Sequence, residues 1–421
     1  MVHELSPAVG HLVQHNLSCR GCGQVGLNPI LSLGHTPLAN ALLREEDLAG
    51  IELTWPLELA WCPDCSLAQI TETVPPETLF RDYAYFSSFS DTMVAHARSI
   101  ADQLRETRKL DHNSLAVEIA SNDGYLLQWY HKAGIPVLGI EPAQNIARVA
   151  EAERGVRTIS EFFGRELATQ LAKSGQQADV IHANNVLAHV ADLNGVVAGF
   201  AALLKPSGIV VVEAPYLKDL LDHVEFDTIY HEHLCHFSLT ALKRLFAQHG
   251  LTIVDVERLA IHGGSLRIFA VHTGSAVVLP AVTHLLEDES HWVRDAALYA
   301  SFGARVESLR TELVGLLDTL KDAGKRIAVY GASAKGSTLM NYFGIGSERL
   351  DFVVDRSTVK QGFYTPGTHL KICDPARLLE DQPDYCLLLT WNFAEEVLKQ
   401  QSQYRQRGGK FIIPIPEVRV A

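Results

Sequence analysis

The residues with the clearest chemical signature are four cysteines near the start of the chain. They form two short pairs, Cys19-Arg-Gly-Cys22 and Cys62-Pro-Asp-Cys65, separated by residues 23–61. Each pair places two thiolates on one tight turn, so two pairs complete the tetrahedral coordination that a structural Zn2+ prefers. An ordinary buried or redox-active pair is the alternative interpretation. Because no open coordination position is evident, we expect a structural zinc ion bound by Cys19, Cys22, Cys62 and Cys65.

A second dense group of reactive side chains lies at Ile229-Tyr-His-Glu-His-Leu234. Tyr230 supplies a phenol that stabilises an oxyanion, His231 or His233 an imidazole that moves a proton, and Glu232 a carboxylate that orients it. A single histidine of this kind is otherwise a hydrogen-bonded core group. The cluster predicts proton transfer to or from a bound substrate.

The elements that must position these groups follow from the hydrophobic pattern. Short apolar strands alternate with helices from residue 115 onward, which is typical of a parallel sheet with crossover helices. Strands are expected at 116–119, 136–140, 180–183 and 209–214, followed by two antiparallel strands at 253–259 and 265–271. Helices are expected at 92–109, 240–249 and 292–323. A second strand-to-helix unit starts at 326–331, with further strands at 352–355, 385–389 and 411–413.

The first of these units carries the features of a nucleotide site. The loop Val117-Glu-Ile-Ala-Ser-Asn-Asp-Gly124 follows the first strand, and Glu141 ends the second, where it is placed to take both ribose hydroxyls. Only one of the three glycines that a pyrophosphate requires is present, which favours S-adenosylmethionine over a dinucleotide. A ligand-free turn is the alternative. The expected cofactor-binding residues are Glu118, Ser121, Asn122, Gly124, Glu141, Pro142, Phe162, Asn184 and Asn185.

The second unit turns from strand to helix at Tyr330-Gly-Ala-Ser-Ala-Lys-Gly-Ser-Thr338. Backbone N–H groups at a helix N-terminus favour an anion, and Lys335 adds a full positive charge. The spacing is not that of a P-loop. A purely structural turn is the alternative, so the motif alone indicates an anion site without identifying the anion.

Composition limits the class of protein. With 421 residues, 47% hydrophobic and 20% charged, the chain is long enough for two or three soluble globular domains. A net charge of -13 argues against general binding to the phosphate backbone of nucleic acids. No secretory signal or long apolar run is present, and seven cysteines, four of them paired, fit a reducing cytoplasm. We expect a cytoplasmic protein that binds neither nucleic acid nor membrane; a monomer is compatible with these data, and the oligomeric state stays open.

Several motifs, taken together and in order, resemble those of the three-domain sugar C-methyltransferases, which methylate C3 of nucleotide-linked 4-keto-deoxysugars. The resemblance covers essentially the whole chain. It implies a zinc-binding module at 1–80, a Rossmann-like S-adenosylmethionine-dependent methyltransferase domain at 81–300, and a Rossmann-like α/β domain for the sugar nucleotide at 301–421. The motifs are the two Cys pairs, Tyr83-Ala-Tyr-Phe-Ser-Ser88, Ser121-Asn-Asp-Gly-Tyr125, Tyr230-His-Glu-His233-Leu and Tyr330-Gly-Ala-Ser-Ala-Lys-Gly336.

The resemblance also implies roles for individual residues. His233 corresponds to the general base, with Glu232 and Tyr230 beside it, and His189 matches a further active-site histidine. His231, adjacent to the base, is then expected to be a scaffold or surface residue. Either Tyr83 or Tyr85 matches an active-site tyrosine, and the sequence does not decide between them. The residues implied for binding of the sugar nucleotide are Gly331, Ser333, Lys335, Asp355, Arg356, Lys360, His369 and Asn392.

Two other classes of function compete with this one. An NAD(P)-dependent nucleotide-sugar oxidoreductase would share the Rossmann-like pattern, although the missing glycines argue against it. A non-enzymatic zinc-ribbon interaction module would not need the cluster around His233. The carrier nucleotide, the deoxysugar and the configuration of the product are not indicated by the sequence.

Overall fold

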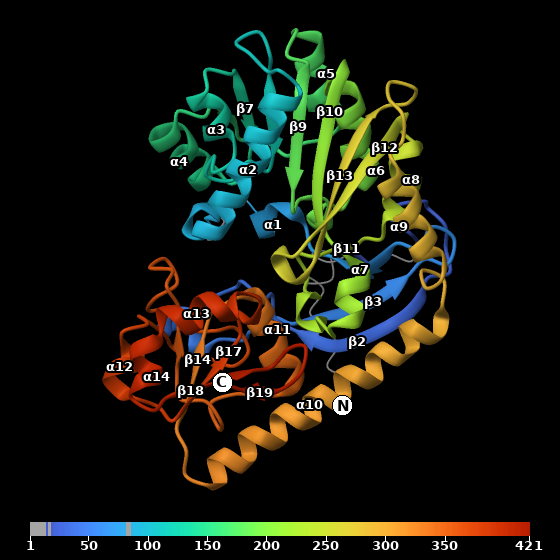
Figure 1. Cartoon of the computed structure of the whole chain (residues 1–421). Coiled ribbons are helices and arrows are strands. Elements are labelled where there is room, and N and C mark those ends of the chain that lie inside the picture. The colour runs from blue at the N-terminus through green and yellow to red at the C-terminus, as the bar shows by residue number, and fades with distance from the viewer. Residues whose placement is uncertain (1–13, 16–17, 81–85) are drawn as a thin grey trace.

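The computed structural model describes residues 14–15, 18–80 and 86–421 of the chain. Figure 1 shows a small N-terminal module in blue, a central domain in cyan to yellow and a C-terminal domain in orange to red. The predicted α/β class, with an N-terminal four-cysteine site and two further α/β units, is confirmed. Within the described ranges, no helix has the length and hydropathy that a membrane span requires.

The N-terminal module is built on an antiparallel sheet of four strands, one of which comes from the central domain. The strand order is β11-β4-β3-β2, so the two-residue strand β11 extends the module at its edge. Leu57, Leu59 and Ile70 of this sheet are buried. The elements are β1 (Gln14–His15), β2 (Asn28–Thr36), β3 (Trp55–Trp61), β4 (Ala68–Ile70), β5 (Glu72–Thr73), β11 (Cys235–His236), the 3-10 helix Glu45–Ala49 and α1 (Pro76–Phe80).

The central domain is a seven-stranded sheet in the order β12-β13-β10-β9-β6-β7-β8. Its five strands from β10 to β8 are parallel, and β13 and β12 are antiparallel. These strands coincide with the predicted ones, apart from the unpredicted β8. The strands are β6 (Ala116–Ile119), β7 (Val137–Ile140), β8 (Thr158–Ile159), β9 (Ala178–Asn184), β10 (Leu204–Pro215), β12 (Leu251–Leu259) and β13 (Ser265–His272).

Helices cover both faces of this sheet because each carries an apolar stripe. On one face, Ile100 and Leu104 of α2 pack with Tyr130 of α3. On the other face, Phe200 of α6 and Phe246 of α8 join the larger core. The helices are α2 (Asp91–Thr107), α3 (Leu127–Lys132), α4 (Gln144–Arg154), α5 (Arg165–Lys173), α6 (Leu193–Leu203), α7 (Leu217–Asp222), α8 (Leu239–Ala247) and α9 (Pro280–Ser290).

The C-terminal domain has a six-stranded sheet in the order β16-β15-β14-β17-β18-β19, parallel except for β19. The predicted strands at 326–331, 352–355, 385–389 and 411–413 match four of these. The two-residue strands β16 and β19 were not predicted. The elements are β14 (Ile327–Tyr330), β15 (Val353–Val354), β16 (Ile372–Cys373), β17 (Tyr385–Leu388), β18 (Lys410–Ile413), β19 (Arg419–Val420), α11 (Ala334–Phe343), α12 (Arg377–Asp381), α13 (Ala394–Gln400) and α14 (Ser402–Gln406).

A single helix, α10 (Ala296–Asp322), leads into the C-terminal domain and runs past the N-terminal module (Figure 1). Its 27 residues span about 40 Å at the usual helical rise. The Tyr299 ring stacks on Trp61 of β3 with the ring centroids 4.7 Å apart. The predicted boundary at residue 300 falls inside this helix, so α10 connects the domains; the predicted boundaries stay a prediction.

Candidate active site

A cavity of about 1070 Å³ lies where all three parts of the chain meet. Its walls include the carboxyl ends of β6, β7 and β9, the loop that contains His233, a segment of the N-terminal module around Asn40, and the β14–α11 turn. Ligands of doubly wound sheets bind at the carboxyl ends of strands. The position and size of the cavity therefore suit two ligands that meet at the central sheet.

Glu141 lies at the end of β7 with its carboxylate held by the backbone. Its Oε2 accepts a hydrogen bond from the Asn122 N–H and its Oε1 one from the Ala143 N–H, both 2.9 Å long. The side chain lines the cavity but is 5% exposed, and this burial raises the pKa of Glu141 to about 7. Since each carboxylate oxygen keeps a further lone pair, Glu141 can still accept from a ligand hydroxyl.

The loop after β6 adopts a backbone shape that normally requires glycine. Ala120 and Asn122 have φ angles of +50° and +48°, in the left-handed region that non-glycine residues rarely occupy. The Asn122 side-chain oxygen accepts a hydrogen bond of 2.9 Å from the Ser87 N–H, which ties the loop to the segment before α2. Such backbone strain is concentrated at functional sites. The turn therefore keeps its left-handed backbone shape without glycine, and it carries the side chains of Ala120 and Asn122.

Three residues expected to bind the cofactor do not line the cavity. Glu118 is fully buried beneath the loop, accepts a hydrogen bond from the Leu127 backbone N–H, and has its pKa raised well above the usual range by burial. Ser121 packs against Gly139, where an added Cβ would lie 2.5 Å from the serine Oγ. Gly124 faces Val156. These residues support the loop from behind, whereas Asn122, Glu141, Pro142, Phe162, Asn184 and Asn185 line the cavity.

The Tyr230–His233 pair occupies the centre of the cavity wall. The His233 Nδ1 lies 2.7 Å from the Thr228 carbonyl oxygen, and the Nε2 lies 2.8 Å from the Tyr230 hydroxyl. Because a carbonyl oxygen can only accept, Nδ1 carries the hydrogen, and the Nε2 lone pair of the neutral ring accepts from the phenol. Burial, with the neighbouring His189 and His236 rings, holds the pKa of His233 well below its usual range. A neutral imidazole with this tautomer can take up a proton at Nε2.

His189 stands beside this pair. Its ring centroid lies 4.8 Å from that of His233, in an edge-on arrangement. Burial lowers the pKa of His189 to about 4, and its buried Nδ1 has no hydrogen-bond partner among the residues that the structure describes. His189 is therefore a neutral ring at physiological pH with a free polar atom beside the cavity. Tyr83 and Tyr85 lie outside the described residues.

The other members of the cluster contact the N-terminal module. Glu232 accepts a hydrogen bond of 2.6 Å from the Asn40 side chain, and the His231 Nε2 lies 3.0 Å from the Pro56 carbonyl oxygen. His231 is buried and has the scaffold role expected of it. The orienting contact on His233, predicted for Glu232, is made by the Thr228 carbonyl. Neither Asn40 nor Thr228 was predicted, because neither belongs to a motif.

The C-terminal wall supplies the positive charge of the cavity. The Lys and Arg side chains that line it, among the residues the structure describes, are Lys335, Arg356 and Lys360. The Lys335 Nζ is buried and lies 4.7 Å from the Trp391 ring centroid, and no hydrogen-bond partner for it occurs in the described ranges 14–15, 18–80 and 86–421. Trp391 in turn donates a 2.7 Å hydrogen bond to Asp227 of the central domain. An anionic ligand group would therefore meet an unpaired ammonium at this wall.

The remaining residues predicted for this wall have several roles. Ser333 caps α11 by accepting a hydrogen bond from the Gly336 N–H, and Asp355 accepts from the Ala332 N–H at 2.7 Å. Both shape the β14–α11 turn, which also needs Gly331, because its φ is +100°. His369 is a correction: it does not line the cavity but lies 2.9 Å from Glu52 of the N-terminal module. Those on the cavity wall are Gly331, Ser333, Lys335, Asp355, Arg356, Lys360 and Asn392.

The four predicted zinc ligands come together away from this cavity. Their sulfur atoms all lie within 4.8 Å of one another, with 3.4 Å between Cys19 and Cys65 and 3.6 Å between Cys22 and Cys62. Four Zn–S bonds of about 2.3 Å in a tetrahedron require sulfur separations of about 3.8 Å. A hydrogen bond from Cys65 lowers the pKa of Cys19 to about 5. The cluster fits a Zn2+ ion with all four positions filled by protein, which is a structural site.

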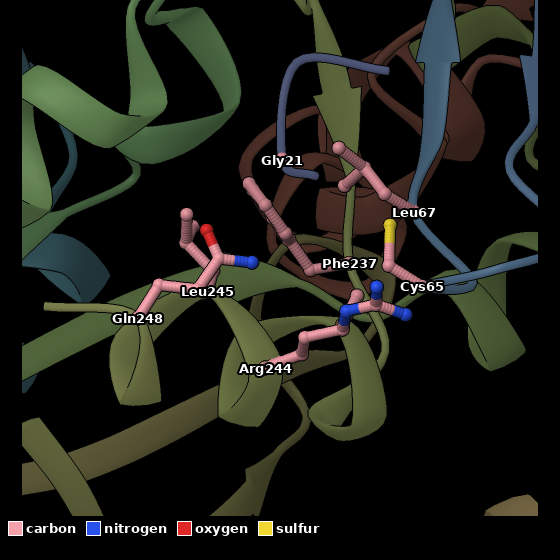
Figure 2. Close-up of a pocket in the computed structure, with 8 residues that line it drawn as sticks. Gly21, Cys65, Leu67, Phe237, Arg244, Leu245 and Gln248 are labelled. Atoms are coloured by element: carbon pink, nitrogen blue, oxygen red, sulfur yellow. The ribbon is translucent and has the colours of Figure 1, made fainter. Parts of the chain in front are cut away.

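A second, much smaller cavity lies beside the zinc ligands (Figure 2). It is bounded by Cys65, Leu67 and Phe237, by Arg244 and Leu245 of α8, and by Gln248 directly after that helix. Its volume of about 10 Å³ holds at most one water molecule. It is a packing gap between α8 and the N-terminal module, whereas Tyr230, His233 and Lys335 line the larger cavity.

Comparison with known proteins assigns each part of the chain. Three family descriptions match in order: a zinc binding domain at residues 19–80, a methyltransferase domain at 94–256, and a C-methyltransferase C-terminal domain at 260–416. The C-methyltransferase NovU of Streptomyces niveus is 38% identical over 404 residues, which is 96% of each chain.

More distant relatives match only part of this chain. A ubiquinone biosynthesis O-methyltransferase of Bartonella tribocorum is 30% identical over 100 residues, covering 24% of this chain and 40% of that protein. Magnesium protoporphyrin IX methyltransferase from Synechocystis PCC 6803 is 14% identical and covers 43% of this chain and 83% of that one, with a TM-score of 0.35 that adds nothing to the assignment. The full-length match and the three ordered domain matches decide the assignment: the chain belongs to the C-methyltransferase family, enzymes that use S-adenosylmethionine and carry an N-terminal zinc-binding domain.

Proposed function

We propose that this enzyme methylates C3 of a nucleotide-linked 4-keto-deoxysugar after removing the proton from that carbon. The observation that carries the proposal is the neutral His233, whose Nε2 lies 2.8 Å from the Tyr230 hydroxyl on the wall of a cavity between two nucleotide-binding-like turns. The relative NovU is a C-methyltransferase, which supports transfer to carbon. The oxidoreductase alternative loses its basis, because the central domain matches methyltransferases.

The proposed division of the cavity follows its charges. Glu141 receives the ribose hydroxyls of S-adenosylmethionine, with Asn122 and Asn184 beside it. Lys335, Arg356 and Lys360 receive the diphosphate of the sugar nucleotide. Between them, the sugar ring meets His233 and Tyr230. The domain boundaries at 1–80, 81–300 and 301–421 remain part of this proposal.

The proposed chemistry begins with a proton transfer. A carbonyl at C4 makes the C3 proton acidic, because the electron pair of the broken C–H bond moves onto the carbonyl oxygen. The Tyr230 hydroxyl first turns its hydrogen from Nε2 to the C4 carbonyl oxygen, which frees the Nε2 lone pair. His233 then takes the C3 proton at Nε2 while its Nδ1–H stays bonded to Thr228, and the Tyr230 hydroxyl donates to the enolate oxygen. When bound, S-adenosylmethionine supplies the methyl group as an electrophile for C3, and its sulfur leaves with the electron pair of the methyl–sulfur bond.

The substrate assignment predicts a strict requirement for the carbonyl. Incubation with methyl-labelled S-adenosylmethionine and a panel of nucleotide-linked 4-keto-deoxysugars should label one or more of them at C3. The matched 4-hydroxy sugars should remain unlabelled, because their C3 proton is not acidic. In 2H2O, the keto sugar alone should exchange its C3 proton. Labelling on oxygen, or of the 4-hydroxy sugars equally well, would contradict the proposal.

The ribose assignment predicts a pH-dependent affinity for S-adenosylmethionine. The pKa of Glu141 is raised to about 7, so the carboxylate form that accepts from the ribose increases as the pH rises from 6 to 8. Affinity should therefore rise with pH over this range, by up to about tenfold. Glu141→Gln should remove this dependence and weaken binding at pH 8 by about 1–3 kcal/mol, or about 5- to 150-fold.

Isothermal titration calorimetry at both pH values measures this effect. Glu396→Gln is the matched control, because Glu396 lines the same cavity from the C-terminal domain. That variant should bind S-adenosylmethionine like the unaltered enzyme. Equal affinities for the Glu141 variant and the control at pH 8 would show that Glu141 does not hold the ribose.

A further inference from the structure

The loop that contains His233 continues directly into the sheet of the N-terminal module. β11 begins two residues after His233 and pairs antiparallel with β4, with Cys235 opposite Gln69 and His236 opposite Ala68. The Ile70 N–H donates a hydrogen bond of 3.0 Å to the Leu234 carbonyl oxygen. The residue next to the base is thus held by the backbone of the N-terminal module.

Arg20 connects this same strand to the cysteine cluster. It lies between Cys19 and Gly21, is 8% exposed, and donates from Nη1 to the Ile70 carbonyl and from Nη2 to the Glu72 carbonyl, each at 2.9 Å. Its own backbone N–H donates to the Gln69 side chain at 2.8 Å. The planar guanidinium fixes two carbonyl groups of the β4–β5 segment in one geometry, which a lysine cannot do.

Ile70 is the residue common to both sets of contacts. Its carbonyl accepts from Arg20 and its N–H donates to Leu234, so both backbone polar groups of this one residue are engaged, one by the guanidinium and one by the segment that follows His233. A displacement of β4 would therefore move Leu234, and with it the His233 ring. Misplacement of a reacting group by about 1 Å can cost a factor of about 10² in rate.

A second arginine allows this role to be separated from simple packing. Arg244 of α8 also donates to a carbonyl of the cysteine turns, that of Asp64, at 2.7 Å. Its contact is exposed and lies on the α8 side of the turn, beside the small cavity in Figure 2. Both arginines thus tie a cysteine turn to a neighbouring element, but only the Arg20 side chain bonds to β4, the strand that pairs with β11.

We propose that Arg20 is a positioning residue for His233, acting through Ile70 and the β4–β11 pairing. The proposal rests on the proposed function for the role of His233. With this role for Arg20, the N-terminal module helps to position the His233 ring in addition to packing against the central domain. The guanidinium acts through the position of the backbone and does not touch the substrate.

The test compares Arg20→Lys, Arg20→Gln and the control Arg244→Gln in the full-length, zinc-loaded enzyme. For both Arg20 variants we expect kcat to fall by about 10- to 100-fold. The KM for the sugar nucleotide and the Kd for S-adenosylmethionine should stay within about twofold, because the cofactor loop and the C-terminal wall are not in this path. The kcat should fall less in Arg20→Lys than in Arg20→Gln, since the lysine ammonium can still donate to one of the two carbonyl groups. Arg244→Gln should keep its kcat.

Hydrogen exchange supplies a readout that does not depend on turnover. The hydrogen-exchange rates of peptides covering Ile70 and Leu234 should increase in the Arg20 variants and stay unchanged in Arg244→Gln. The zinc content of each variant is measured in parallel. Unchanged kcat and unchanged exchange in a zinc-loaded Arg20→Lys would overturn the proposal. So would equal losses in the Arg20 and Arg244 variants, which would indicate general destabilisation. If the unaltered enzyme does not methylate keto sugars, the proposed function fails, whereas the exchange data still decide whether Arg20 holds the β4–β11 pairing.

Discussion

Replacement of His233 by Asn is expected to slow methyl transfer by about 10²–10⁴-fold, the usual contribution of a positioned base. The same variant should lose exchange of the substrate C3 proton with 2H2O, because in the proposed mechanism both reactions need Nε2 to accept that proton. Binding of S-adenosylmethionine and of the sugar nucleotide should change little, since His233 touches only the reacting part of the cavity. Single-turnover kinetics, proton NMR and calorimetry measure the three quantities.

A control for this experiment is Tyr230→Phe, which keeps the ring but removes the hydroxyl bonded to Nε2. It should lower the rate of enolate formation without abolishing it, because the base remains. If His233→Asn still methylates at close to the original rate, the base is another group. His189, with its unpaired Nδ1 next to the His233 ring, would then be the first candidate.

The second large effect concerns zinc. Replacing Cys62 and Cys65 together by Ser should lower the zinc content from one ion per chain to near zero and destabilise the N-terminal module strongly. Structural zinc contributes about 10–16 kcal/mol of binding free energy in small zinc modules, and this energy is largely folding energy. Elemental analysis and differential scanning calorimetry measure the two losses. Because β11 belongs to the sheet of this module, turnover should be lost as well.

The control variant is Cys373→Ser, which alters a partly exposed cysteine outside the cluster. It should retain zinc and thermal stability. A purified parent enzyme without zinc, or a double serine variant of unchanged stability, would show that the four cysteines serve another purpose. A disulfide would then be the natural alternative for sulfur atoms 3.4–3.6 Å apart.

Local sequence signals predicted much of this structure because they act over short distances. The strand-to-helix alternation placed β6, β7, β9 and β10, and the two Cys pairs identified the metal cluster. Glu141 was recognisable because it follows a strand of the parallel sheet, where ligands usually bind. The Tyr230–His233 group was recognisable because its members lie within four residues of one another. In these cases the residues that act together are neighbours in sequence or at equivalent strand ends.

Contacts across long sequence separations were beyond such reasoning. Asn40 bonds to Glu232 across 192 residues, and Glu52 bonds to His369 across 317. Strand β11 has only two residues, too few for any periodicity to reveal it. The missing glycines of the loop after β6 were interpreted as a sign that no pyrophosphate binds there, and its left-handed backbone was not predicted. Ala120 and Asn122 adopt that backbone because the surrounding contacts over-determine it.

The connecting helix α10 restricts how chain length can change in this enzyme. Its buried side chains, Tyr299, Phe302, Val306, Leu309, Leu313 and Leu317, form one continuous stripe with helical spacing. A residue inserted halfway would rotate everything beyond it by about 100° and shift it by about 1.5 Å. Half of the stripe would then face away from its partners, and the cationic wall of the cavity would turn with it. Point substitutions can accumulate along α10, whereas insertions and deletions there should be rejected unless they come in sets that restore the helical phase.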